Sequence, residues 1–315
     1  MVFISGLVFS DIHKILFNCF SYLRNVIYVK LIRVNNWVKN LFIFLPLFFS
    51  GEFFNPIKIT NTFYVTLGFS LVTSFIYIIN DIFDIEFDKI HPEKRNRPIP
   101  SGKISVKQSM ILGICLLSLG LTGLWNISFD GFLLTVFYIV LNLLYSIKLK
   151  QIPIVDFIIV ATGFVIRILI GGEIGNVELS QWIIVMVFLL SLFIAVTKRR
   201  DDVYQYELKK KINRKVVSEY TVNYMDKLIT IISSVLLVSY LLFITSESVI
   251  SRYPSKYLIV TFLFVLIGVF RYNQITYVKN KSGSPIKIFF KDLFLQLTLL
   301  LWGLTFFFII YSDKF

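Results

Sequence analysis

Long apolar runs separated by short polar connections make up most of the chain. Nine of these runs come near the roughly 20 residues that a helix needs to cross the hydrocarbon core of a bilayer, although the first is short. They cover residues 41–55, 59–80, 106–128, 130–147, 152–171, 181–197, 228–246, 257–274 and 290–311. The pattern therefore predicts an all-α integral membrane protein with about nine transmembrane helices.

Composition supports the same class of protein. Of the 315 residues, 56% are hydrophobic and only 16% are charged, a balance that excludes an ordinary water-soluble domain. No Gly/Ser-rich linker or low-complexity tract divides the chain, so we expect a single transmembrane catalytic domain over residues 41–315. Residues 1–40 are expected to form an amino-terminal interfacial segment, because residues 22–38 mix apolar and basic positions as surface-lying helices do.

The basic residues indicate how the helices are oriented. If the amino end is cytoplasmic, 27 of the 32 Lys and Arg residues fall on the cytoplasmic side and four on the other, with Arg167 inside a span. Because positive residues concentrate on the cytoplasmic side, we expect the amino end in and the carboxyl end out, in the cytoplasmic membrane. The net charge of +13 then reflects topology and attraction to anionic lipid, and no nucleic-acid partner is expected.

Residues 80–102 combine acidic and basic side chains at the end of the second run. Asp81, Asp84 and Asp88 are spaced three and four apart, so on a helix they share one face. Crowded carboxylates repel one another unless a cation lies among them, and Mg²⁺ typically binds through a few carboxylates together with substrate phosphates. The spacing predicts a catalytic magnesium site for a diphosphate. The alternative is a polar loop at the membrane surface, which any multispanning protein has.

Other polar residues gather at the ends of spans on the expected cytoplasmic side. Cations beside carboxylates at several helix ends can hold both Mg²⁺ and phosphate oxygens, so these residues are predicted to bind substrate. The set is Lys39, Asn40, Asn80, Lys94, Arg95, Arg97, Tyr145, Lys150, Asp156, Lys198, Arg199 and Asp202. His91 is interpreted instead as a structural or hydrogen-bonding residue.

Arg167 is a further substrate-binding candidate within the fifth span. A cation at the centre of a span costs roughly 2.5 to 3.5 kcal/mol on insertion scales and usually has a partner. The side chain can therefore belong to the site or extend outward to the membrane surface, and the sequence leaves both interpretations open. Nearby glycines, Gly163, Gly171 and Gly172, are expected to allow helices to approach closely.

The acidic pattern also carries a resemblance. Asn-Asp-x-x-Asp-x-x-x-Asp at residues 80–88, after the second span, resembles the first aspartate motif of the UbiA-type prenyltransferase superfamily, as does Tyr145 to Lys150 with Asp156 following. A narrower match is to the polyprenyl-phosphate phosphoribosyltransferases. It consists of WVKN followed by a proline, HPEKRNRP with SGK behind it, GFVIR, and KRRDD at the end of the sixth span.

This resemblance implies Mg²⁺-dependent transfer of 5-phosphoribose from phosphoribosyl diphosphate to a polyprenyl phosphate, for synthesis of a cell-envelope pentose donor. Lys94, Arg95 and Arg97 would neutralise phosphate oxygens. The chain departs from the superfamily at the second motif, because Asp201 and Asp202 are adjacent rather than spaced Asp-x-x-x-Asp. An aromatic prenyltransferase with an isoprenyl diphosphate donor, and a transporter or channel with a polar vestibule, are the alternatives; the oligomeric state is open.

Overall fold

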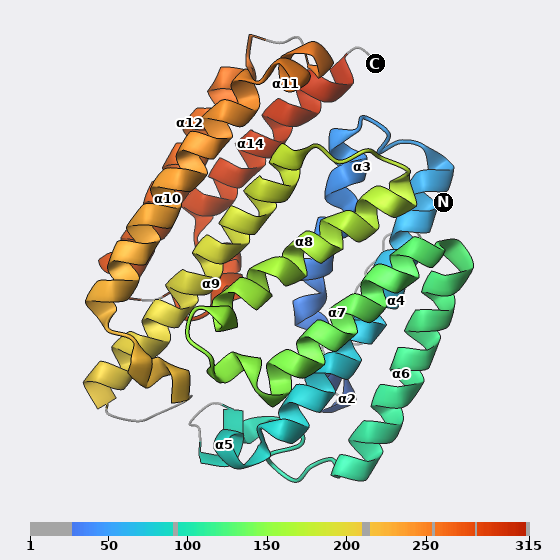
Figure 1. Ribbon diagram of the computed structural model, residues 1–315, viewed down its shortest axis with the longest axis vertical. Helices are drawn as coiled ribbons and strands as arrows, with labels where there is room; N and C mark the ends of the chain where they lie inside the picture. Colours follow the sequence, from blue (N-terminus) through green and yellow to red (C-terminus); the bar gives the residue numbers. More distant parts are fainter. Residues whose placement is uncertain (1–26, 91–93, 210–214, 254–255, 281, 313–315) are drawn as a thin grey trace, which may run out of the picture. The chain divides into compact units, whose positions relative to one another are not determined.

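We describe the protein from a computed structural model over residues 27–90, 94–209, 215–253, 256–280 and 282–312 (Figure 1). These residues form helices and, within these ranges, no strand. In chain order the helices are α2 (Ile27–Ile32), η1 (Val34–Phe44), α3 (Leu45–Phe49), α4 (Pro56–Phe83), α5 (Ile85–Ile90), η2 (Lys94–Asn96), α6 (Val106–Ile127), α7 (Phe129–Ile147), η3 (Leu149–Gln151), α8 (Val155–Gly175), α9 (Gln181–Lys209), η4 (Lys215–Glu219), α10 (Val222–Thr245), α11 (Glu247–Arg252), α12 (Leu258–Tyr277), α13 (Pro285–Lys291) and α14 (Leu293–Tyr311).

Eight of the described helices are long and apolar enough to cross a membrane: α4, α6, α7, α8, α9, α10, α12 and α14. They coincide with eight of the nine predicted spans, so the multi-pass helical class is confirmed. The first predicted span, at 41–55, is not among them. The described chain from 27 to 49 is helical in three short pieces, α2, η1 and α3. Only the end of η1 and α3 fall within that predicted span, and α2 with the start of η1 is the described part of the predicted interfacial helix.

Arg33 separates the first two of these pieces. Its backbone is left-handed, with φ of 54°, a conformation that non-glycine residues rarely adopt. The α-helix therefore stops at Ile32, and a 3₁₀ helix begins at Val34. Polar residues between 27 and 40 lower the hydropathy of that part of the chain, so the apolar pattern predicted a span only from residue 41 onward.

Several long helices extend beyond the apolar runs that predicted them. Helix α9 continues to Lys209, because the Lys, Arg and Glu residues beyond the apolar run are themselves good helix formers. Side chains define other starts: Ser128 accepts a hydrogen bond from the Gly131 amide at α7, and Thr221 accepts one from the Tyr224 amide at α10. Capping side chains thus fix where α7 and α10 begin.

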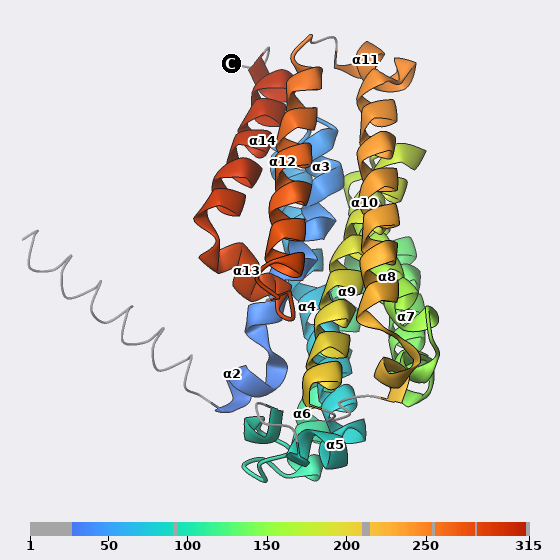
Figure 2. The ribbon, with the colours of Figure 1, turned by 90° about the vertical axis from the view of Figure 1, so that its left-hand side faces the viewer.

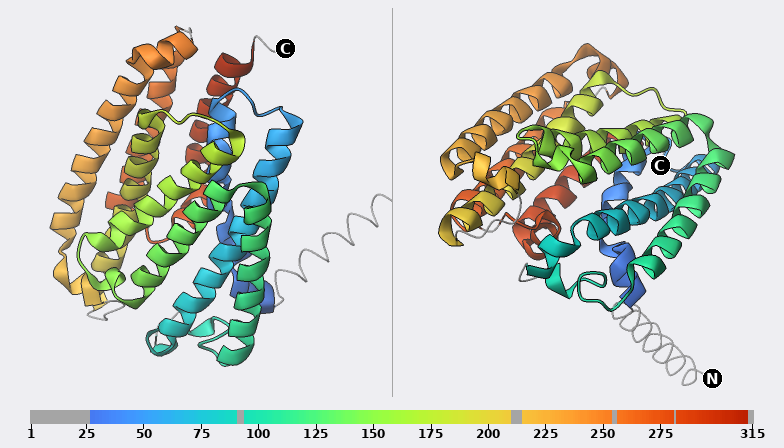
Figure 3. Two further views of the ribbon diagram at one scale, coloured as in Figure 1. Left: turned by 45° about the vertical axis from the view of Figure 1, so that its right-hand side comes forward. Right: turned by 60° about the horizontal axis from the view of Figure 1, so that its bottom comes forward.

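The chain divides into two compact units, and helix α4 runs from one into the other. The first unit comprises the described residues up to Leu41 together with Val65–Asn126. Its core includes Leu31, Ile78, Ile99 and Ile104. Helices α4 and α6 approach closely within this unit (Figure 3), since a Cβ added at Gly120 would lie 2.6 Å from the Gly68 carbonyl oxygen.

The second unit comprises Phe42–Tyr64 and Ile127–Phe315. Its long helices pack in succession, α7 on α8, α8 on α9, α9 on α10, α10 on α12 and α12 on α14 (Figures 1 and 2). A Cβ added at Gly171 of α8 would lie 2.0 Å from the carbonyl oxygen of Ile43, so this glycine allows the close helix approach expected of it. Helix α8 is thereby enclosed, and 61% of its apolar 18-residue stretch is buried.

Candidate functional site

The acidic motif of the first unit lies where α4 gives way to α5. Helix α4 ends at Phe83, and Asp84 occupies the turn before α5. The chain keeps helical hydrogen bonding through this turn, because the Asp84 amide donates to the Asn80 carbonyl at 3.0 Å and the Asp88 amide donates to the Asp84 carbonyl at 2.8 Å. The helix-like spacing predicted for the three aspartates is therefore preserved across the break.

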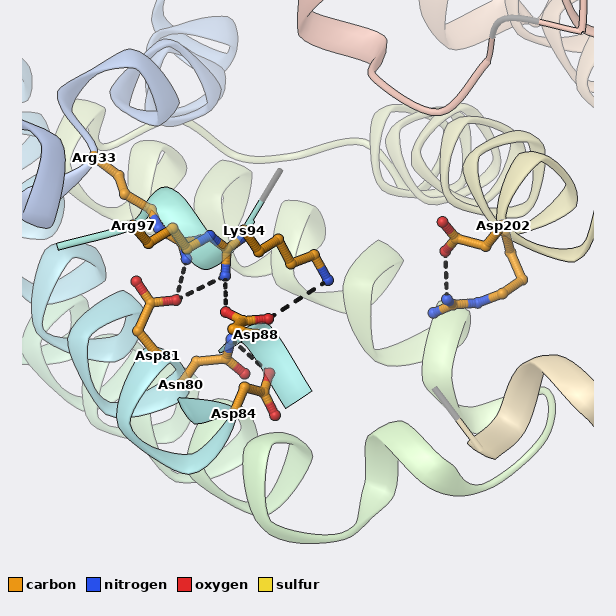
Figure 4. Close-up of polar contacts among 9 residues, drawn as sticks. Arg33, Asn80, Asp81, Asp84, Asp88, Lys94, Arg97 and Asp202 are labelled. Carbon is orange, nitrogen blue, oxygen red and sulfur yellow. Dashed lines mark hydrogen bonds and ion pairs between the residues drawn. The ribbon is translucent and has the colours of Figure 1, made fainter. Parts of the chain in front are cut away.

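Two of the aspartates face the same cation. Arg97 Nη1 donates to Asp81 Oδ1 at 2.9 Å and to Asp88 Oδ2 at 2.5 Å (Figure 4). Arg33 also pairs with Asp81, and Lys94 Nζ lies 3.9 Å from Asp88 Oδ1. Asp81 and Asp88 are 1% and 2% exposed, so the positive partners offset the cost of burying two carboxylates.

Asp84 lies in the same segment with a different partner. Its Oδ2 accepts a hydrogen bond from Asn80 Nδ2 at 3.3 Å. Among the described residues, no group of three or more His, Cys, Asp and Glu side chains is gathered closely enough to hold a metal ion. The oxygen donors nevertheless suit Mg²⁺, because Asp81 and Asp88 already converge on one cationic nitrogen. These two carboxylates fit a divalent cation best.

Asn40 is tied to α4 within the first unit. It is 1% exposed, and its Nδ2 donates to Ser70 Oγ at 2.9 Å and to Thr73 Oγ1 at 3.3 Å. Trp37 Nε1 donates to Ser74 Oγ at 3.0 Å one turn earlier. The segment that carries Lys39, which is half-buried, is thus fixed against α4. Arg95 is exposed in η2, and His91 lies outside the described residues.

A second charged cluster lies within the second unit, where α8 begins. Asp156 is fully buried, and its Oδ2 accepts bonds from Arg199 Nε and Nη2, both at 2.7 Å. Arg199 Nη1 donates to Asp202 Oδ2 at 2.7 Å, the contact drawn beside Asp202 in Figure 4. The structure therefore brings three of the predicted site residues together. Lys198, by contrast, is exposed.

Two further predicted residues follow α7. Tyr145 is half-buried in its last turn, and Lys150 is only 9% exposed in η3. A lysine is almost never buried so deeply without polar surroundings. Lys150 is therefore buried in a short helix that packs on α8, and its role in substrate binding stays a prediction.

Arg167 is buried in the middle of α8 at 4% exposure. Its Nη1 donates to the Gly163 carbonyl at 2.6 Å, its Nη2 donates to Tyr138 Oη at 3.0 Å, and the guanidinium lies 5.0 and 5.1 Å from the ring centres of Tyr138 and Phe164. The side chain turns back toward the start of α8. It does not extend past the other helix end, so the outward interpretation does not hold.

Two residues of these clusters were not predicted. Arg33 pairs with an aspartate 48 positions away and lies 5.0 Å from the Tyr77 ring centre. Tyr220 Oη accepts from the Ile154 amide at 2.6 Å and donates to Asp156 Oδ1 at 3.2 Å. No local sequence pattern marks either residue as part of a site, although Arg33 belongs to the same polar segment as Lys39. Burial raises the pKa of Tyr220 to about 12, so its phenol stays protonated.

Comparisons with known proteins identify relatives of this chain and a solved structure that shares its fold. The chain is 29% identical to a protein named decaprenyl-phosphate phosphoribosyltransferase from Corynebacterium glutamicum, over 87% of this chain and 83% of that one. It is 30% identical to a protein of the same name from Mycolicibacterium smegmatis, over 87% and 89%. The solved structure of a UbiA homolog from Archaeoglobus fulgidus bound to GPP and Mg²⁺ shares the fold, with a TM-score of 0.68, 20% identity, and coverage of 90% of this chain and 99% of that one.

A family model also matches most of the chain. Residues 41–300 match the model of the UbiA prenyltransferase family, a range that includes the acidic motif, the Arg199 cluster and every described long helix at least in part. The protein therefore belongs to the UbiA prenyltransferase family.

Proposed function

We propose that the protein transfers a 5-phosphoribosyl group from 5-phosphoribosyl 1-diphosphate to a polyprenyl phosphate, with Mg²⁺ as cofactor. The products are polyprenyl-phosphoryl-5-phosphoribose and diphosphate. The observation that carries this proposal is the similarity, along 87% of the chain, to relatives named decaprenyl-phosphate phosphoribosyltransferase. A transferase acting at the membrane also accords with the eight apolar helices, which offer surface for a long isoprenoid tail.

The reaction requires little proton transfer. An oxygen of the acceptor phosphate forms a bond to the anomeric carbon of the donor, the bond from that carbon to the diphosphate breaks, and its electron pair leaves with the diphosphate. A phosphate monoester is already anionic near neutral pH, so no general base is needed. The demanding part is stabilising the negative charge that develops on the leaving group.

Asp81 and Asp88 are the residues that would hold Mg²⁺, with Asp84 and Asn80 beside them. When bound, Mg²⁺ supplies Lewis-acid stabilisation of the departing diphosphate. Arg97 and Lys94 neutralise these carboxylates in the free protein. They lie close enough to donate to diphosphate oxygens once the donor is bound, and the planar guanidinium of Arg97 suits bidentate contact.

The second cluster would bind another phosphate group. Arg199 within α9 and Lys150 in η3 are buried cations of the second unit, and each would take either the 5-phosphate of the donor or the lipid phosphate. We assign the charged helix ends to the cytoplasmic side of the cell membrane, because most basic residues then lie on that side. Residues 41–315 would form one catalytic domain.

Incubation of purified protein in lipid with Mg²⁺, a polyprenyl phosphate and radiolabelled phosphoribosyl diphosphate tests the proposal. Label should pass into the organic phase and should disappear with a chelator. Asp81→Asn and Asp88→Asn should each lower turnover by about 100-fold or more. Glu86→Gln is the matched control, because Glu86 lies between Asp81 and Asp88 in sequence but is exposed and pairs only with Lys89 among the contacts of the described residues.

Two outcomes would contradict the proposal. Near-normal turnover in both aspartate variants would contradict the assignment of these residues as magnesium ligands. Consumption of an isoprenyl diphosphate with an aromatic acceptor, together with no labelled lipid, would assign the chain to the prenyl-transferring branch of the same family.

A further inference from the structure

A strained turn precedes α8. Ile154 has φ of 69° and ψ of −49°, and the Val155 amide donates across it to the Pro153 carbonyl at 2.7 Å. This is the γ-turn of the rare, unfavourable hand, and its central residue is β-branched, which makes the conformation worse. Such strain persists only where the surroundings hold it, and it is concentrated at functional sites. The surroundings of Ile154 must therefore hold this turn in place.

The hydroxyl of Tyr220 supplies the outside contact to this turn. It accepts the Ile154 amide at 2.6 Å, and the same oxygen donates to Asp156 Oδ1 at 3.2 Å. Tyr220 is 6% exposed, and its ring lies 6.3 Å from that of Phe157 and stacks on that of Tyr224 at 6.0 Å. Because its phenol stays protonated, one buried oxygen both holds the strained backbone and orients a carboxylate.

Asp156 passes this orientation to Arg199. One carboxylate oxygen accepts from Tyr220, and the other accepts from Arg199 Nε and Nη2 at 2.7 Å. With both oxygens occupied, rotation of the carboxylate would break bonds on either side. The Arg199 guanidinium is thus aligned by a buried partner that is itself aligned by Tyr220, and its Nη1 is directed to Asp202.

We propose that Tyr220 is a positioning residue that acts through Asp156 to fix the guanidinium of Arg199 for contact with a substrate phosphate. The proposal rests on the proposed function in that Arg199 is taken to bind either the 5-phosphate of the donor or the phosphate of the lipid. Both ligands offer the same phosphate oxygens, and the two are separated by experiment.

Tyr220→Phe removes the hydroxyl and leaves the ring. With donor and acceptor varied separately, KM should rise roughly 10-fold for the substrate whose phosphate Arg199 contacts, the worth of one hydrogen bond to a charged group, and should stay unchanged for the other. Tyr224→Phe is the matched control, since it deletes the same atom from the ring stacked on Tyr220, and that hydroxyl has no bonded partner among the described residues. Unchanged KM values for both substrates in Tyr220→Phe would overturn the proposal.

Two double variants separate positioning from simple support of the turn. Tyr220→Phe should add little further loss in an Asp156→Asn background, because both changes act on the same guanidinium. Ile154→Gly accepts the turn without strain. If Tyr220 served only to hold that turn, Ile154→Gly would restore normal kinetics to Tyr220→Phe. We expect no restoration, and recovery to the wild-type KM would refute the positioning role.

A binding measurement keeps this test independent of the overall reaction. Ribose 5-phosphate, inorganic diphosphate with Mg²⁺, and a polyprenyl phosphate are each titrated while the unfolding temperature is followed. At least one should bind the wild-type protein and should bind Tyr220→Phe roughly 10-fold more weakly. If wild-type protein made no lipid-linked phosphoribose, the proposed function would fail, yet this difference would still support Tyr220. If wild type and Tyr220→Phe bound each of the three probes equally, or if wild-type protein bound none of them, the positioning role of Tyr220 would be overturned.

Discussion

Replacing Arg97 by glutamine tests how the buried carboxylates of the acidic motif are balanced. Arg97 is the partner that Asp81 and Asp88 share, at 2.9 and 2.5 Å, and the two carboxylate side chains are only 2% and 3% exposed. Glutamine keeps much of the side chain and removes the charge. In the metal-free protein, Arg97→Gln should therefore lower stability, because two buried anions lose the cation between them.

The magnitude follows from the partners that remain. Removing one member of a buried ion pair typically costs about 3–5 kcal/mol. Asp81 keeps Arg33, and Asp88 keeps Lys94 at 3.9 Å, while the Arg97 side chain is itself 28% exposed and partly screened. We therefore expect a loss of about 2 kcal/mol, equivalent to a fall of about 3 °C in the unfolding temperature of a chain of this length.

Mg²⁺ should reverse this loss. The variant presents two uncompensated carboxylates, so Mg²⁺ alone should bind it at least about 10-fold more tightly than it binds the wild-type protein. Thermal unfolding in detergent across a Mg²⁺ titration measures both effects. Arg95→Gln is the matched control, because it removes the same charge from an exposed side chain two residues earlier. An unfolding temperature within about 1 °C of wild type, with the same response to Mg²⁺, would refute the reasoning.

Two further predictions concern the second unit. Gly171→Ala should cost about 3 kcal/mol or more, since its Cβ would lie 2.0 Å from the backbone oxygen of Ile43, whereas Gly303→Ala, with nothing within 4 Å, should be close to neutral; equal unfolding temperatures would contradict this. Asp292 caps α14, and the hydrogen bond from Arg271 lowers the pKa of its carboxyl group. The ionised carboxylate therefore stabilises the folded protein above the unfolded-state pKa of about 3.9, and this contribution is lost as the pH falls through the lower folded-state pKa. The stability difference between wild type and Asp292→Asn should therefore shrink below about pH 4, and a constant difference would show that the carboxylate contributes nothing.

The fold was largely predictable because the length and hydropathy of an apolar run identify a transmembrane helix. Eight apolar runs correspond to eight helices, with ends displaced by a few residues where charged helix formers continue the helix. The first predicted span differs because polar residues interrupt the stretch from 27 to 49, and hydropathy alone does not report a helix that changes from α to 3₁₀ at Arg33.

The site was predictable where its signal is local. The spacing of Asp81, Asp84 and Asp88 predicted that they share one face and hold Mg²⁺; Asp81 and Asp88 do converge, on Arg97, and the magnesium site stays a prediction. Contacts over long separations left no such signal. Arg33 meets Asp81 across 48 residues, and Tyr220 meets Ile154 across 66, in a loop that reads as an ordinary charged connection. Such pairings are set by how helices pack, which no local pattern records.

The contact between Arg167 and Tyr138 bears on how the chain enters the membrane during synthesis. An arginine near the middle of an isolated span makes insertion less favourable by roughly 2.5 to 3.5 kcal/mol. Here the hydroxyl and ring of Tyr138 on α7 solvate the guanidinium of α8, and only a short connection joins the two helices. Helix α8 thus depends on its predecessor, and the two are expected to partition into lipid as a hairpin. A glycosylation-reporter assay of α8 with and without α7 measures that dependence, and equal insertion of both segments would show that α8 enters alone.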